Sequence, residues 1–490
     1  MSTLPLAPES GWDALYRDGE WIEPGDRESI EVDNPYTRET IATVPAGTQE
    51  DVDRAYEVAA SCQEAWANQP PQRRASVCNR ALRALTDHWD EVVELLAVES
   101  GSTSVKSVAE LQTAKGMMQQ AASYPFRMAG EHADSIVPGK ENVVERVPVG
   151  VVGVISPWNF PLHLSMRAVA PAIAAGNAVV LKPASNTPIT GGLLLARLFE
   201  EAGLPDGVLN VVTGRGSEIG DAMAGHEIPR VLAFTGSTEI GQRVAKRAAE
   251  NTALPALELG GNNVHVVTEN ADLDRAIDGA VFGSFLHQGQ ACISINRHLV
   301  HESLYDEYVD ALTDRAASLP AGDPLDDDTV IGPIIDENQR DTMLEFVAES
   351  VDEGATIVTG GEHEGLVVEP TVLADASNQM AAACNEHFGP IAPVIPYADD
   401  EEAIELANDT VHGLSGSVHS ADLSQARRIA DGIETGMIHV NDQPINDEPH
   451  VPFGGVKDSG LGRYNADSIL EEVTTTKWIS IQHEPRQYQF

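Results

Sequence analysis

The chain has 490 residues, of which 42% are hydrophobic, and its 76 acidic residues against 31 basic ones give a formal charge of -45. This length and hydrophobic content allow two or three domains with buried cores, which excludes a disordered or fibrous protein. So large a negative charge repels nucleic acid phosphates and anionic membrane surfaces, and we expect neither as a partner.

The acidic residues are spread over the whole chain, with local runs at 323–328 and 399–405, and the basic residues are mostly arginine. This composition resembles that of proteins from salt-loving organisms, in which high salt screens the repulsion between like charges. An ordinary acidic protein is the alternative. The charge therefore predicts a halophilic source and indicates little about function.

Targeting signals and metal motifs are missing from the sequence. The N-terminal residues show no basic region followed by an apolar core, and no stretch approaches the roughly 18 apolar residues of a membrane span. The cysteines, at positions 62, 78, 292 and 384, are too scattered for a disulfide framework or a zinc site. We therefore expect a cytoplasmic protein that holds no metal.

The hydrophobic pattern predicts an α/β protein. Residues 50–123 are amphipathic and predict helices, and residues 135–150 alternate as in a β-hairpin. Between 149 and 267, solid apolar runs alternate with helical segments, which is typical of a parallel sheet covered on both faces. Residues 271–440 predict a second α/β domain, and residues 474–482 could pair with the hairpin of this chain or of another subunit.

Polar residues at the ends of the predicted strands are candidates for ligand binding, because ligands of such sheets collect at the carboxyl ends of the strands. In "FTGSTEIG", a strand ends at Thr235 and a helix follows Gly236 and Ser237, which suits a pyrophosphate at a helix N-terminus. An ordinary capped turn explains this motif equally well. Lys182 ends the apolar strand of "VVLKPAS" and suits an anionic or hydroxylated ligand.

Cys292 and Glu258 are candidates for chemistry. Cys292 lies in the polar turn "HQGQACIS", whereas the other cysteines are expected to be inert core residues. Glu258 ends the apolar strand of "LELGGNN", where burial would raise its pKa toward that of a general base. A strand-end acid that only caps a loop is the alternative. Asn159 stands between two aromatic residues and two prolines in "SPWNFP".

Seven motifs follow one another in a fixed order: Asn159 in "SPWNFP", Lys182 in "LKPAS", "FTGSTEIG", Glu258 in "LELGG", Cys292 in "GQAC", Glu386 in "EHFGP", and "PFGGVKDSGLGR" at 452–463. In this order they resemble the aldehyde dehydrogenase superfamily over nearly the entire chain. The resemblance implies oxidation of an aldehyde to its acid with NAD or NADP.

The resemblance also implies a role for each matched residue. Cys292 would attack the aldehyde, Glu258 would activate the water that hydrolyses the thioester, and Asn159 would hold the oxyanion. The presence of Glu258 argues against the branch that transfers its acyl group to coenzyme A. The residues expected at the cofactor are Trp158, Lys182, Ser185, Gly236, Ser237, Gly241, Glu386 and Phe388.

The resemblance implies a domain division and an oligomer as well. A Rossmann-like cofactor domain would span residues 1–129 and 150–260, and a catalytic domain would span 261–470. A small β element at 130–149 and 471–490 would form a homodimer or homotetramer.

Two positions bear on specificity. Many NAD-preferring relatives carry glutamate where this chain has Ser185, and the loss of that charge predicts that NADP is accepted, leaving open whether it is preferred. The chain looks most like the benzaldehyde and vanillin type of enzyme, so we expect an aromatic aldehyde. Arg167 resembles a position at which semialdehyde enzymes pair a distal carboxylate, so succinate or 2-oxoglutarate semialdehyde is an alternative. A catalytically inactive relative and a simple hydrolase also remain open.

Overall fold

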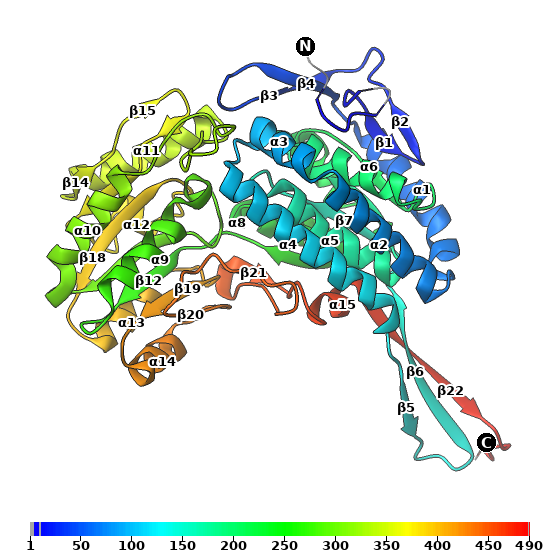
Figure 1. Ribbon diagram of the computed structural model, residues 1–490. Coiled ribbons are helices and arrows are strands. Elements are labelled where there is room, and N and C mark those ends of the chain that lie inside the picture. The colour runs from blue at the N-terminus through cyan, green and yellow to red at the C-terminus, as the bar shows by residue number, and fades with distance from the viewer. Residues whose placement is uncertain (1–3, 9–10, 489) are drawn as a thin grey trace.

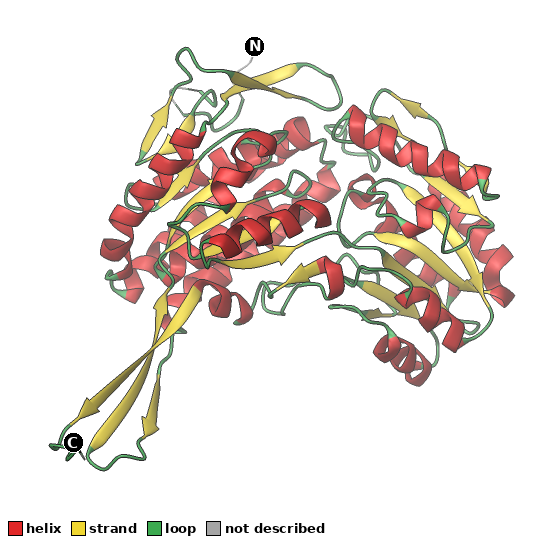
Figure 2. Cartoon of the chain, turned by 180° about the vertical axis from the view of Figure 1, so that it is seen from behind, coloured by secondary structure: helices red, strands yellow, loops and turns green. Residues whose placement is uncertain are grey.

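The computed structural model describes residues 4–8, 11–488 and 490 (Figure 1). In this part of the chain two lobes lie side by side, each built on a β-sheet with helices packed over it. A long arm of β-strands projects from the first lobe and carries the C-terminus (Figures 1 and 2). No helix within the described ranges is long and apolar enough to cross a membrane.

The sheet of the first lobe has the strand order β2-β1-β9-β8-β7-β10-β11-β21. The strands from β9 to β11 are parallel, as the apolar runs predict, whereas the edge strands β1, β2 and β21 are antiparallel to their neighbours. The prediction of one sheet over 149–267 is wrong for its last run, because residues 263–267 form a strand of the second lobe. The strands are β1 Leu15–Arg17, β2 Glu20–Ile22, β7 Val151–Ile155, β8 Ala178–Lys182, β9 Leu209–Val211, β10 Val231–Thr235, β11 Leu254–Glu258 and β21 Gly460–Leu461.

Helices cover the faces of this sheet and bury its central strands. The predicted helical region 50–123 is confirmed as α1 to α4, and α5 is buried along its whole length between the sheet and these helices. Each Val or Leu side chain buried here contributes about 1.5–3 kcal/mol. The helices are α1 Gln49–Ala67, α2 Pro71–Asp87, α3 Trp89–Ser100, α4 Ser104–Ser123, α5 Pro161–Ala175, α6 Leu194–Glu201, α7 Gly216–Ala224, α8 Thr238–Glu250 and α15 Ser468–Val473.

The sheet of the second lobe has the strand order β14-β17-β18-β13-β12-β19-β20, and only β14 is antiparallel to its neighbour within the described residues. Its strands are β12 Asn263–Val267, β13 Ile295–His301, β14 Thr356–Thr359, β17 Thr371–Ala374, β18 Ile391–Tyr397, β19 Gly416–His419 and β20 His439–Val440. Its helices are α9 Leu273–Phe285, α10 Tyr305–Ala317, α11 Glu337–Asp352, α12 Ala381–Cys384, α13 Asp400–Asn408 and α14 Leu423–Gly432.

The chain passes between the lobes twice near the predicted domain boundary. The first passage lies between β11 and β12, at residues 259–262. The second passage returns the chain to the first lobe, where β21 pairs with β11 and α15 packs against α5. Residues 460–470 were expected in the catalytic domain, but these elements lie in the first lobe, since a short edge strand at 460–461 leaves no periodic signal.

The arm consists of β5 Glu131–Asp134, β6 Lys140–Pro148 and β22 Thr474–Gln482. The hairpin predicted at 135–150 begins earlier, at 131, because residues 135–139 form its turn. The segment 474–482 pairs with β6 of the same chain, from Thr474 opposite Pro148 to Gln482 opposite Lys140. The first and last parts of the arm are thereby joined far from both lobes.

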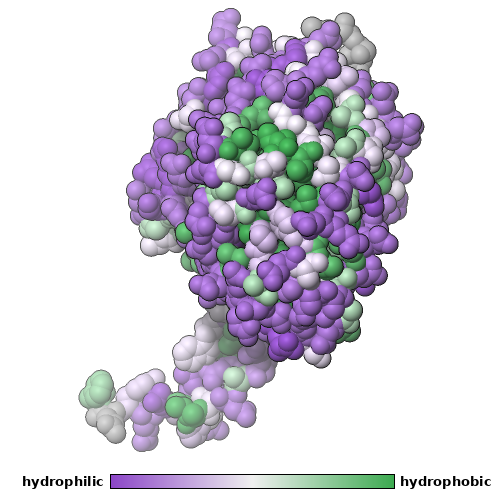
Figure 3. Space-filling view, turned by 90° about the vertical axis from the view of Figure 1, so that its left-hand side faces the viewer, coloured by the Kyte–Doolittle hydropathy of each residue, from purple (hydrophilic) through white to green (hydrophobic). Residues whose placement is uncertain are grey.

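Several short elements were not predicted from the sequence. The hairpin of β3 Ser29–Asp33 and β4 Thr40–Pro45 packs near the N-terminal strands, and β15 His363–Glu364 pairs with β16 Val367–Val368 in the second lobe. Hydrophilic side chains cover most of the face of the second lobe that Figure 3 shows, in accordance with the acidic composition of the chain.

Candidate active site

The loop between β7 and α5 carries Asn159. Pro161 is the first residue of α5, and the N–H of His163 in the first turn donates to the Glu110 carboxylate of α4 at 3.1 Å, so a neighbouring helix caps α5. Asn159 is 4% exposed, and its Nδ2 donates to the carbonyl of Gln290 at 2.9 Å. The loop of the first lobe is therefore fixed directly to the loop that precedes Cys292.

The Cys292 loop is held in an unfavourable backbone conformation. His287, Gln288 and Gly289 have φ values of 52°, 56° and 71°, in the left-handed region that costs non-glycine residues about 1–2 kcal/mol each. The side chain of Gln288 donates to the carbonyl of Pro333 at 2.8 Å, which helps to hold this conformation. The loop thus presents Cys292 in a defined position.

Asn263, the first residue of β12, fixes the Cys292 loop to the second sheet. Its Nδ2 donates to the carbonyls of Cys292 at 2.9 Å and Ser294 at 2.7 Å, and its Oδ1 accepts from the N–H of Ser415 at 2.9 Å. Cys292 is therefore anchored to the second lobe, whereas Asn159 belongs to the first.

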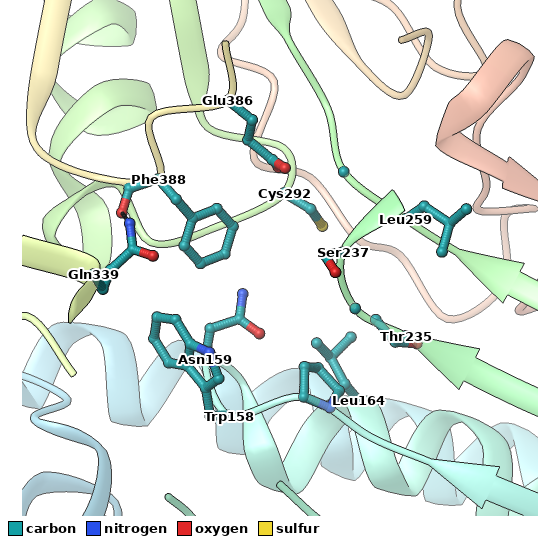
Figure 4. Close-up of a pocket in the computed structure, with 13 residues that line it drawn as sticks. Trp158, Asn159, Leu164, Thr235, Ser237, Leu259, Cys292, Gln339, Glu386 and Phe388 are labelled. Carbon is teal, nitrogen blue, oxygen red and sulfur yellow. Dashed lines mark hydrogen bonds between the residues drawn. The ribbon is translucent and has the colours of Figure 1, made fainter. Parts of the chain in front are cut away.

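A cavity of about 270 Å³ lies between the lobes (Figure 4). The thiol of Cys292, the amide of Asn159, the carboxylate of Glu386 and the ring of Phe388 face this hollow, the last two from the same loop between α12 and β18. Its lining residues are Pro157, Trp158, Asn159, Leu164, Thr235, Gly236, Ser237, Leu259, Gly260, Cys292, Gln339, Glu386 and Phe388.

A second cavity of about 110 Å³ lies on the other side of Cys292 and shares Asn159, Leu164 and Cys292 with the first. Aromatic and aliphatic side chains make up much of its wall, together with a few charged groups. Its lining residues are Ala109, Glu110, Thr113, Asn159, Phe160, His163, Leu164, Arg167, Phe282, Leu286, Ala291, Cys292, Ile293, Ile445, Asp447 and Phe453. Cys292 thus stands where two differently built cavities meet.

The first cavity has an aromatic wall. The rings of Trp158 and Phe388 meet edge to face, with centroids 5.5 Å apart. Phe388 has a φ of 50°, and Gln339 of α11 donates to the carbonyls of His387 at 3.1 Å and Phe388 at 3.2 Å. Gln339 therefore positions the segment that carries Phe388, a function that no motif in the sequence indicated.

Two further groups make the first cavity suitable for a nucleotide. The α8 helix starts at Thr238 beside Gly236 and Ser237, and the Ser237 side chain does not cap it, so its first N–H groups are available to an anion. Glu386 accepts from the N–H of Gly261 at 2.9 Å, and burial raises its pKa to about 7. A carboxylate here can accept hydrogen bonds from ribose hydroxyls.

Three of the expected cofactor residues do not line this cavity. Lys182 is buried at the end of β8, where its Nζ donates to the carbonyl of Pro183 at 2.9 Å and burial lowers its pKa to about 8. Ser185 is half-buried in the loop that follows. Gly241 packs so closely against Leu259 that a Cβ atom has no room, so its local role is to bring α8 close to the sheet.

Glu258 ends β11 and is 1% exposed. Neither carboxylate oxygen has a hydrogen-bond partner among the described residues. Burial raises its pKa to about 8, although Arg167 and Arg463 act in the opposite direction. The side chain lines neither cavity and lies against the backbone of Gly454.

The thiol of Cys292 is protonated in this environment. Burial, followed by the nearby Glu386, raises its pKa to about 12. All of the cysteines, at 62, 78, 292 and 384, are free thiols in the described structure. Attack by Cys292 therefore requires a base that accepts the thiol proton, or a nearby positive charge that stabilises the thiolate.

Arg167 lines the second cavity, but its charge is engaged. Its guanidinium forms an ion pair with Asp447 and lies 4.1 Å from the centre of the Phe453 ring. Burial opposes the ionisation of Asp447, yet Arg167 and His163 outweigh it and hold the pKa of Asp447 well below its usual range. Because Arg167 is paired with Asp447, its presence does not indicate a semialdehyde substrate.

Asp447 is the main residue of the second cavity that the sequence did not single out. It lies in an irregular loop, where no periodicity indicates which side chains point inward. The resemblance of the chain to enzymes of the benzaldehyde and vanillin type includes the stretch "NDQPINDEPHVPFGG" at 441–455, but it indicates no role for Asp447 by itself.

Comparison with known proteins gives a consistent result. The sequence model of the aldehyde dehydrogenase family matches residues 21–479. Benzaldehyde dehydrogenase YfmT of Bacillus subtilis is 45% identical over 96% of this chain and 97% of its own length, and vanillin dehydrogenase of Corynebacterium glutamicum is 47% identical over 95% and 96%. The crystal structure of betaine aldehyde dehydrogenase from Staphylococcus aureus in complex with NAD+ superposes with a TM-score of 0.95 at 35% identity, over 98% of this chain and 96% of that chain.

Proposed function

The chain belongs to the aldehyde dehydrogenase family and is an oxidoreductase, and from this premise we propose that it oxidises an aromatic aldehyde to the carboxylic acid with NAD(P)+. The observation that carries the proposal is the pair of cavities that meet at Cys292 and Asn159. The larger one takes the nicotinamide nucleotide, and the smaller one takes the aldehyde.

The reaction starts when the Cys292 thiol loses its proton to solvent and the resulting thiolate attacks the aldehyde carbon to form a thiohemiacetal. The carbonyl oxygen becomes negatively charged and accepts hydrogen bonds from Asn159 Nδ2 and from the backbone N–H of Cys292. One N–H of the Asn159 amide is already bonded to Gln290, so the other serves the oxyanion. NAD(P)+, when bound, supplies the hydride acceptor, and a thioester remains on Cys292.

Glu258 acts in the hydrolysis of this thioester. In its ionised form it takes a proton from the attacking water, which adds to the acyl carbon and displaces the Cys292 sulfur. A pKa of about 8 makes the carboxylate a stronger base than an exposed glutamate. Because Glu258 lines neither cavity, its side chain has to turn toward Cys292 for this step.

The walls of the second cavity support an aromatic substrate. Phe160, Phe282 and Phe453 contribute ring faces and edges, and Leu286 and Ile445 contribute aliphatic surface. A volume of about 110 Å³ is of the same order as the roughly 150 Å³ of an apolar cavity that binds benzene. Two of the similar enzymes are named for benzaldehyde and vanillin, which agrees with this chemistry.

The described residues of the first cavity fit a nicotinamide nucleotide. Gly236, Ser237 and the start of α8 would hold the pyrophosphate, Glu386 the nicotinamide ribose, and Trp158 and Phe388 the ring. Lys182 and Ser185 would contact the adenosine ribose farther along the sheet edge, with Gly241 allowing the close approach of α8. Ser185 offers no charge against a 2′-phosphate, so we propose that NADP is accepted.

The assembly and location remain proposals as well. The arm of β5, β6 and β22 exposes Trp478 and Ile481 far from both lobes, and we propose that it joins copies of the chain into a homodimer or homotetramer. The free thiols suit a reducing cytoplasm. The acidic, arginine-rich composition supports a halophilic source.

One experiment tests the function. Purified protein in molar salt is given benzaldehyde, vanillin, an aliphatic aldehyde and succinate semialdehyde, each with NAD or NADP, and the reduced nucleotide is measured by absorbance. Mass spectrometry of rapidly quenched samples should find the acyl group on Cys292, and Cys292→Ala should abolish both signals. No reduction of nucleotide with any aldehyde would indicate an inactive relative, and acid formation without nucleotide would indicate a hydrolase.

A semialdehyde substrate is the second candidate, and only the position of Arg167 in the cavity favours it. Its ion pair with Asp447 leaves no free positive charge for a distal carboxylate. The aldehyde panel distinguishes the two, because a semialdehyde enzyme would show its highest kcat/KM with succinate semialdehyde.

A further inference from the structure

The second cavity contains a charged pair whose members neutralise each other. Arg167 extends from α5 of the first lobe, and Asp447 lies in the loop after β20. Their side chains are 3% and 10% exposed, and both line the cavity. A buried cation that faces a substrate cavity would normally attract an anion, but here the protein supplies that anion itself.

Other contacts hold Asp447 in this position. Asn465 Nδ2 donates to Asp447 Oδ1 at 2.7 Å, and His163 Nε2 lies 3.1 Å from Asp447 Oδ2. The Arg167 guanidinium is in turn stacked on Phe453. Asp447 is therefore fixed by three neighbours, and the ion pair is part of a connected polar cluster.

The other carboxylate in the wall of this cavity is also neutralised. Glu110 forms an ion pair with Lys106, and the side chains of both residues are 0% exposed. The Nζ atom of Lys106 also lies 4.5 Å from the centre of the Phe160 ring. Among the described lining residues, each carboxylate thus has its own cation, so the wall offers an incoming carboxylate no unmatched positive charge.

We propose that Asp447 determines the charge selectivity of the enzyme, because by occupying Arg167 it makes the second cavity accept uncharged aldehydes and reject aldehydes that carry a carboxylate. The inference rests on the proposed function and names the class of substrate within it. An anionic substrate would meet the like charge of Asp447 and find Arg167 already paired, whereas an uncharged ring meets apolar walls.

Two aldehydes of nearly the same shape measure this selectivity. 4-Nitrobenzaldehyde and 4-carboxybenzaldehyde differ in the charge of the para group. The quantity measured is the kcat/KM for the carboxylated compound divided by the kcat/KM for the nitro compound. Because the intrinsic reactivity of the two aldehydes is the same with every variant, a difference in this ratio between variants reports charge selectivity. In the wild-type enzyme we expect a strong preference for the nitro compound. The Asp447→Asn side chain can still accept a hydrogen bond from Asn465. This substitution should raise the ratio of carboxylated to nitro kcat/KM at least about tenfold above its wild-type value.

Two variants serve as controls. The double variant Arg167→Gln/Asp447→Asn removes the released cation, and its ratio should return to within about threefold of the wild-type value. Asp442→Asn removes the same charge from an exposed residue of the same loop that lines neither cavity, and its ratio should not change. Asp447→Ser provides the same loss of charge by a different side chain, in case Asp447→Asn does not fold.

The outcomes separate a failure of the selectivity from a failure of the function. If the wild-type enzyme oxidises neither 4-nitrobenzaldehyde nor 4-carboxybenzaldehyde, the proposed function itself is contradicted. If the wild type oxidises 4-nitrobenzaldehyde, and a folded Asp447 variant also does so with an unchanged ratio, then Asp447 does not set the selectivity. A rise in the ratio that persists in the double variant would also overturn the proposal, since Arg167 would not be responsible.

Discussion

Replacing Asn159 by alanine tests the oxyanion role most directly. The amide is 4% exposed, lines both cavities and uses one N–H on the Gln290 carbonyl. Its other N–H is the side-chain donor proposed for the developing negative charge. Loss of one such donor costs about 100- to 1,000-fold in rate, equivalent to about 2.7–4 kcal/mol of transition-state stabilisation.

The same substitution has a separate structural cost. It removes the donor from the buried Gln290 carbonyl, which corresponds to about 1–3 kcal/mol of unfolding free energy. Since domains are commonly stable by about 5–15 kcal/mol, the variant should remain folded. Asn210→Ala is the matched control, because Asn210 is 0% exposed and donates to the carbonyl of Gly207 at 2.7 Å, away from both cavities.

Stopped-flow measurement of the first turnover separates the two effects. The rate of the NAD(P)H burst should fall about 100- to 1,000-fold in Asn159→Ala, with a smaller change in KM, and stay near the wild-type value in Asn210→Ala. Alkylation of Cys292 by iodoacetamide forms no oxyanion, so its rate should change little. A burst within about threefold of the wild-type rate in folded Asn159→Ala would refute the oxyanion role.

Three further predictions concern other parts of the molecule. Thioester hydrolysis should accelerate as pH rises toward about 8 and level off above it, because Glu258 acts in its ionised form and burial raises its pKa to about 8. Glu258→Gln should keep the NAD(P)H burst but lose steady-state turnover. A hydrolysis rate that does not depend on pH would contradict this role. Ser185→Glu should lower kcat/KM for NADP relative to NAD at least about tenfold, whereas an unchanged ratio would show that position 185 does not contact the ribose. Dilution from molar to about 0.1 M salt should lower the thermal unfolding temperature, since a charge of -45 is then screened less; a temperature independent of salt would argue against a halophilic protein.

The parts of the fold with strong periodicity could be predicted from the sequence. The central strands β7, β8, β10 and β11 are solid apolar runs between helices, and the positions of Lys182 and Glu258 at strand ends follow from those runs. Strands such as β1 and β21 could not be predicted, because two or three residues give no period and depend on the neighbouring strand.

The site shows the same division. Cys292, Asn159 and Glu386 belong to motifs that are recognisable without coordinates, and the structure brings all three to one cavity. Gln339 and Asp447 could not be found in this way, because their importance comes from what they contact: the carbonyl of Phe388 for Gln339, and the guanidinium of Arg167 for Asp447. Such pairings join segments far apart in the chain.

The division of the site between the lobes links cofactor binding to stability. Trp158 and Ser237 belong to the first lobe and Cys292 and Glu386 to the second, so a molecule in the first cavity touches both and resists their separation. At 100 times its dissociation constant, such a ligand adds about 2.7 kcal/mol to the free energy of unfolding. The survival of this protein in a heated cell would then follow the size of the dinucleotide pool.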